Sequence, residues 1–178
     1  PVPTPTPTPV PAPTPTPTPV PVPTPTPAPT ATPLPTPTAA SVITKTADSD
    51  DGVCDSDCSL REAIAAAGSG STINIPAGTY TLTVGSELTI NNNLTLIGAD
   101  QANTIIQATA DGSIQSRVLS VGGGNVSIAN VTIKNGTEVV VGDEGGGILV
   151  SSGTLPLSNS TVTGNTAYKG EVSLVGPH

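Results

Sequence analysis

The sequence is poor in the residues that usually fill an irregular core. It contains no Phe, Trp or Met, and its only aromatic residues are Tyr80 and Tyr168. A close-packed interior must therefore be built almost entirely from Val, Ile, Leu and Ala. These small and evenly shaped side chains favour repeated layers over an irregular globule.

Positive charge is also scarce. Five Lys and Arg residues stand against 13 Asp and Glu residues, which gives a net charge of −8. Because a nucleic-acid-binding surface needs clustered basic side chains, we expect no nucleic-acid partner. No apolar run approaches the roughly 18 residues of a membrane-spanning helix, so we expect no membrane span in this chain.

Proline is abundant only near the N-terminus. Residues 1–40 hold 18 of the 21 prolines, mostly alternating with Thr, and no charged residue. Proline at alternate positions removes backbone donors and disfavours helix, so we predict an extended polyproline II segment. This composition fits both a stalk that holds a domain away from a cell surface and a plain linker between domains.

Residues 41–71 are predicted to form an N-terminal cap, beginning with a short strand over residues 41–44. An acidic loop follows, with carboxylates at Asp48, Asp50, Asp51, Asp55 and Asp57. One interpretation is a calcium site, because Ca²⁺ prefers several carboxylate oxygens, although the glycine spacing differs from that of an EF-hand. The other is a solvated turn whose acids lie favourably before a helix N-terminus. No other cofactor is indicated.

Cysteine occurs only twice, at Cys54 and Cys58. Two thiols are too few for a structural zinc site, and the single histidine is the terminal His178. We predict a disulfide formed in an oxidising compartment, with two free buried thiols as the alternative.

One helical pattern follows the cysteines. Ser59 and Glu62 have the spacing of a capping box, and Gly68 is expected to end the helix. The apolar residues then fall on one stripe of a helix, at Leu60, Ala63, Ile64 and Ala67. We predict that this stripe plugs the open end of the first coil near Ile73, Ile75 and Leu82, while Arg61 faces solvent.

Residues 72–178 read as short alternating strands separated by turn residues. The pair Leu88/Ile90 recurs as Leu119/Val121 and as Ile148/Val150, at offsets of 31 and then 29 residues. A repeat of this length without helices predicts a β-solenoid, and hence an all-β fold. A β-sandwich is the structural alternative, but its hairpin signals are less clear.

The last coil departs from this pattern. Pro156 removes one ladder donor, so the strand around it is expected to be weakened or to lie near an exposed edge. No capping pattern follows Tyr168, so we expect the coils to be incomplete at their C-terminal end. An uncovered coil exposes apolar core and strand edges, and we therefore expect self-association there.

The segment Cys58-Ser59-Leu60-Arg61-Glu62-Ala63-Ile64 resembles the signature of the CSLREA-domain family of bacterial secreted and surface proteins. The preceding Asp-Gly-Val-Cys-Asp-Ser-Asp and the following Ile-Pro-Ala-Gly-Thr-Tyr fit this resemblance. It implies a capped, right-handed parallel β-helix at an extracellular or cell-surface location. It implies no defined reaction.

The expected function is that of a non-enzymatic, adhesive or structural β-helix module that contacts a surface glycan or a protein ligand. We assign no catalytic residue. The alternative is a polysaccharide lyase or glycosidase whose site lies wholly or partly outside this chain. Such sites need paired carboxylates or a metal with a base. Asp111 and the pair Asp143/Glu144, which fall in corresponding loops, are the acids that could stack on one face.

Overall fold

The computed structural model describes residues 1–4, 12, 42–110, 116–139, 144–168 and 172–174. The chain divides into two units, Pro1–Leu34 and Pro35–His178. Most of the expected linker, with Asp111, Asp143 and the end of the chain, lies outside the described residues. Every described helix and strand belongs to the second unit.

The second unit contains one short helix, α1 (Leu60–Ala66), and strands of two to five residues. The strands are β1 (Ser71–Ile75), β2 (Gly78–Leu82), β3 (Leu88–Ile90), β4 (Leu94–Gly98), β5 (Thr104–Ala108), β6 (Leu119–Val121), β7 (Val126–Ala129), β8 (Thr132–Lys134), β9 (Thr137–Glu138), β10 (Ile148–Val150), β11 (Leu157–Ser158), β12 (Thr161–Thr163), β13 (Thr166–Ala167) and β14 (Val172–Leu174).

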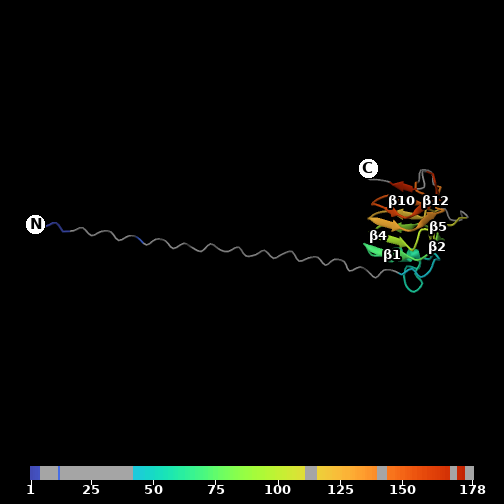
Figure 1. Ribbon diagram of the computed structural model, residues 1–178, viewed down its shortest axis with the longest axis horizontal. Helices are drawn as coiled ribbons and strands as arrows, with labels where there is room; N and C mark the ends of the chain where they lie inside the picture. The colour runs from blue at the N-terminus through green and yellow to red at the C-terminus, as the bar shows by residue number, and fades with distance from the viewer. Residues whose placement is uncertain (5–11, 13–41, 111–115, 140–143, 169–171, 175–178) are drawn as a thin grey trace. The chain divides into compact units, whose positions relative to one another are not determined.

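The strands form parallel sheets that run the length of the folded unit. We name the three four-stranded sheets by their first strands: the β1 sheet (β1-β4-β7-β11), the β2 sheet (β2-β5-β8-β12) and the β3 sheet (β3-β6-β10-β14). A smaller parallel pair joins β9 to β13. Figure 1 shows successive strands of each sheet stacked from β1 and β2, in green, to β10 and β12, in orange and red. Each strand therefore pairs with its counterpart in the next coil, and the fold is a parallel β-helix.

The register confirms the sequence repeat. Leu119 pairs with Leu88 on one side and with Ile148 on the other. These three side chains are at most 2% exposed, and they stack with the other inward aliphatic residues in one continuous core. Each coil thus buries its core residues against the coils above and below, as a solenoid requires.

The bends between sheets depend on asparagine and glycine. Asn130 and Asn159 occupy matching positions and both have left-handed φ values, 59° and 46°. Asn tolerates this conformation better than other side chains. At Gly98, one coil earlier, an added Cβ would lie 2.2 Å from the carbonyl oxygen of Asn130. The close approach of stacked coils therefore requires glycine there.

Pro156 precedes β11, which forms the edge of the β1 sheet, and this confirms the edge position expected from the proline. Leu157 in β11 is 38% exposed, whereas its register partner Ile128 is fully buried. The side chain at this core position is therefore less buried in the last described coil than in the coil before it.

Two local predictions are wrong. Residues 42–44 form no strand, because the amides of Thr44 and Lys45 both donate to the carbonyl oxygen of Cys58 and so cannot build a ladder. Helix α1 ends at Ala66, and the extended backbone of Ala67 (φ −69°, ψ 123°) stops it before Gly68. No helix in the described part of the chain is long and apolar enough to cross a membrane.

Candidate functional site

Helix α1 covers one end of the core. It contacts β1 and β3, and the exposed fractions of Leu60, Ala63 and Ile64 are 3%, 0% and 7%. These side chains share one core cluster with the inward residues of the first coil, including Ile73, Ile75 and Leu82. Ala67, just past the helix, packs against the same cluster. The sequence-predicted stripe thus lies against the first coil.

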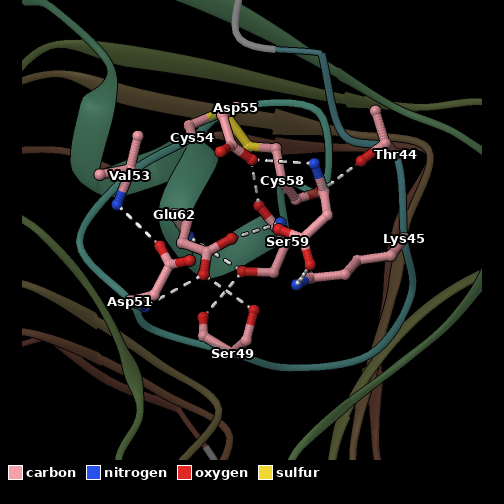
Figure 2. Close-up of a disulfide and its surroundings, with 11 residues drawn as sticks. Thr44, Lys45, Ser49, Asp51, Val53, Cys54, Asp55, Cys58, Ser59 and Glu62 are labelled. Atoms are coloured by element: carbon pink, nitrogen blue, oxygen red, sulfur yellow. Dashed lines mark hydrogen bonds and ion pairs between the residues drawn. A yellow bond between two sulfur atoms is a disulfide. The ribbon is translucent and has the colours of Figure 1, made fainter.

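The capping box holds the start of α1 and also gathers the acidic loop. The amide of Glu62 donates to Ser59 Oγ, and the amide of Ser59 donates to Glu62 Oε2 at 2.7 Å. Glu62 Oε1 accepts from Ser49 Oγ at 2.8 Å and from the amide of Asp51 at 3.2 Å. Figure 2 shows the carboxylate between these donors. The bond from the Ser59 amide, with those from Ser49 and Asp51, lowers the pKa of Glu62 to about 2 despite burial.

A disulfide joins Cys54 to Cys58 just before the helix, with the two Cα atoms 4.5 Å apart (Figure 2). Cys58 is fully buried, and its carbonyl oxygen accepts from the amide of Thr44 at 2.9 Å. The bridge therefore fixes a small loop directly against the start of α1 and the segment that precedes the acidic loop.

The acidic residues of the cap interact with separate partners and not with a common centre. Asp51 accepts from the amide of Val53 within its own turn, as Asp55 does from the amide of Asp57. Asp57 pairs with Lys45 at 2.8 Å. Within the described ranges, no group of three or more His, Cys, Asp or Glu side chains is arranged to hold a metal ion. The structure does not gather the five carboxylates, so calcium binding stays a prediction without geometric support.

Arg61 was expected to face solvent, and this is wrong. It is 8% exposed, and its Nε and Nη2 donate to the two carboxylate oxygens of Asp48 at 2.8 and 3.0 Å. Its remaining donors reach the carbonyl oxygens of Ser86 at 2.8 Å and Glu87 at 3.1 Å. Arg61 lies on the flank of α1 that faces the turn between β2 and β3, so it joins the cap to the first coil.

Asp48 is held by the Arg61 side chain and by two backbone amides. Its Oδ2 also accepts from the amides of Thr83 and Val84, at 2.8 and 2.9 Å. Burial acts to raise the pKa of Asp48, but the bonds from Arg61, Val84 and Thr83 outweigh it and lower that pKa below its ordinary value. The Arg61–Asp48 pair therefore has a structural role, because it links the cap to the residues that follow β2.

A second charged group continues along the coils. Arg117 pairs with Glu138 at 3.0 Å and with Glu87 at 3.5 Å, and it donates to the carbonyl oxygens of Glu144 and Gly145. The side chain of Arg117 is only 12% exposed. Sequence reasoning missed this group, although Glu87 and Arg117, which have opposite charges, lie about one repeat apart in the sequence. That spacing is the signal that could have found the pair.

Polar side chains line the outer face of the β2 sheet. The register places four of them in one row: Thr81, Gln107, Lys134 and Thr163. The Gln107 amide donates to Thr81 Oγ1 at 2.9 Å and accepts from Asn135 Nδ2 at 3.3 Å. The row is therefore partly ordered by its own hydrogen bonds and presents hydroxyl, amide and ammonium groups at successive coils.

The sequence model of a family described as rhamnogalacturonase A/epimerase, pectate lyase-like matches residues 41–142, more than half of the chain. The chain belongs to this family. No curated protein and no solved structure matches it.

The match to the pectate lyase-like family begins at the cap and includes α1 and the strands from β1 to β9. Strands β10 to β14 continue the same parallel register beyond the matched residues. The matched residues therefore include the cap, the Arg61–Asp48 pair, Glu87, Arg117 and Glu138, together with the row on the β2 sheet as far as Lys134. Thr163, the last residue of that row, lies beyond the match.

Proposed function

We propose that this pectate lyase-like domain is a non-enzymatic module of a secreted or cell-surface protein, and that it contacts polysaccharide through the polar outer face of its β2 sheet. The family description names polysaccharide enzymes, which supports a ligand of this class. The disulfide and the CSLREA-like motif in the cap support the extracellular location and the closer relationship to surface β-helix proteins.

The observation that carries the proposal is the row Thr81, Gln107, Lys134 and Thr163 on the β2 sheet. Parallel strands are about 4.8 Å apart, so the row offers a polar group at each such step. A sugar chain that lies along it would make many weak hydrogen bonds, and such bonds become effective together. This is the behaviour of an adhesive or structural surface.

The charged side chains support the non-enzymatic assignment. Glu87 and Glu138 share Arg117, and Asp48 is held by Arg61 and two amides. A carboxylate that acts as a general acid or base must be free to exchange a proton with the substrate. A carboxylate that is held by an arginine and by backbone amides is not free in this way. These carboxylates are better placed to stabilise the coils than to react.

The alternative function is that of a polysaccharide lyase or glycosidase. The family description favours it, because its printed name includes rhamnogalacturonase and pectate lyase. In that case the reacting groups would include residues outside the described part of the chain.

One pair of assays separates the two functions. We expect the full chain to be retained on an immobilised polysaccharide panel without releasing reducing or unsaturated ends. Gln107→Ala should weaken retention several-fold, while Thr95→Ala on the outer face of the β1 sheet serves as the matched control. Failure to retain any glycan would overturn the proposal, and release of cleaved ends would replace it with the enzyme.

A further inference from the structure

A groove lies between α1 and β3, which is the edge strand of the β3 sheet. It consists of two hollows of about 240 and 230 Å³ that share Ile64, Ala65 and Thr89 as lining residues. Ile64 is nearly buried and Ala65 is exposed, so these two side chains give the groove an apolar floor.

The rim of the groove is polar. Asp50 and Glu87 line one end, and Asn91 lines the other. In the part of the chain that the structure describes, the side chains of Asp50, Thr89 and Asn91 make no hydrogen bond or ion pair. These polar groups are therefore available to a ligand.

The backbone of β3 adds a donor and an acceptor. The amide of Leu88 donates to Val118, and the carbonyl oxygen of Ile90 accepts from Gly122, so both residues direct these groups toward β6. In a parallel pair the next residue along the strand directs its N–H and C=O to the opposite side. The backbone N–H and C=O of Thr89 are therefore directed away from β6, on the unpaired edge of the β3 sheet, where Thr89 lines the groove.

We infer that this groove binds a neutral sugar unit of the polysaccharide, an inference that rests on the proposed function. An apolar floor with a few polar groups on its rim is the usual composition of a small-ligand site. Sugar hydroxyls both donate and accept, and the groove offers both, whereas Ile64 and Ala65 suit the C–H face of the ring. The unpaired carboxylate of Asp50, on a chain of net charge −8, disfavours a uronate.

Helix α1 offers a matched pair of variants. Ala65 and Ala66 are both exposed, but only Ala65 lines the groove. Ala65→Gln should fill the groove and weaken binding of neutral oligosaccharides by about tenfold or more, while Ala66→Gln should leave it unchanged. Titration calorimetry of the full chain with glucan, galactan, mannan and galacturonan oligosaccharides of equal length measures this. Circular dichroism confirms that both variants are folded.

The charge argument has its own test, because Asp50→Asn should raise the affinity for galacturonan oligosaccharides relative to the affinity for the neutral ones. If Ala65→Gln and Ala66→Gln bind sugars as the unmodified chain does, the groove inference fails and the proposed function stands. Tighter binding of galacturonan than of every neutral sugar by the unmodified chain overturns the inference as well. Binding of no oligosaccharide in the panel overturns both.

Discussion

Glu62 accepts hydrogen bonds from three separate positions of the cap. Its carboxylate accepts from the Ser59 amide, the Ser49 hydroxyl and the Asp51 amide, and it is 2% exposed. It therefore connects the helix N-terminus to two points of the acidic loop. A carboxylate that accepts several N–H and O–H bonds strongly favours its charged form.

The stability of the domain should fall in acid because of Glu62. Its pKa is about 2 in the folded chain against an ordinary value of 4.5, so its contribution is complete above pH 4.5 and is lost as the pH falls toward 2. Glu62→Gln should therefore lower the free energy of unfolding most at neutral pH and least near pH 2. Urea unfolding at several pH values measures this difference. Parallel pH profiles for the two proteins would contradict it.

Arg61→Gln should destabilise the domain by about 3 kcal/mol, because it leaves the Asp48 carboxylate buried without its ionic partner. The side chain of Asp48 is 3% exposed. Lys45→Gln is the matched control, since its partner Asp57 is 65% exposed and a surface pair contributes little. Urea unfolding at neutral pH checks both variants. Equal effects at the two positions would show that the buried pair has no special role.

At the scale of elements, the cap and the first coil depend on each other. Helix α1 has seven residues, which is too short to be stable in water without tertiary contacts. Its apolar stripe covers core residues of β1 and β3 that would otherwise be open to solvent. The disulfide and the capping box hold the helix where this cover is needed.

Replacing Leu60 tests the plug. Leu60→Ala should cost about 3 kcal/mol through lost burial and a cavity, and Leu60→Asp should unfold or aggregate the domain. Ala66→Asp places the same carboxylate at an exposed position of the helix and should change the melting temperature little. Thermal unfolding followed by circular dichroism gives the comparison. A Leu60→Asp variant as stable as Ala66→Asp would show that packing of α1 against the first coil does not stabilise the domain.

The elements differ in how well the sequence predicts them. The coils are predictable because Leu88, Leu119 and Ile148 recur at the interval that the parallel register imposes. The strand expected at residues 41–44 is absent from its described part, residues 42–44, because β-propensity acts only when a partner strand is present. Arg61 was misplaced because helical periodicity describes one helix, and not Asp48, which folds against its flank. The Arg117 pairs were missed because the strand pattern of one coil does not include the charged side chains that neighbouring coils bring beside it.

At the scale of the whole folded unit, the two ends of the coil stack differ. Helix α1 closes the end at β1 and β3, whereas β11 and β12 are edge strands at the other end among the residues that the structure describes. Leu157 in β11 is 38% exposed, and Val162 in β12 is only partly buried. An edge strand with apolar neighbours tends to pair with another chain.

We propose that copies of this chain associate through the β11–β12 end. Because α1 closes the opposite end, head-to-tail stacking is blocked, and the contact should join two like ends in a closed dimer. Sedimentation velocity over a range of concentrations should show this dimer for the unmodified chain and a monomer for Leu157→Lys. Val53→Lys is the control, since Val53 is 57% exposed in the cap loop and should leave the dimer intact. Association that survives Leu157→Lys, or that grows into filaments, would place the contact elsewhere, because a like-ended interface closes after two copies.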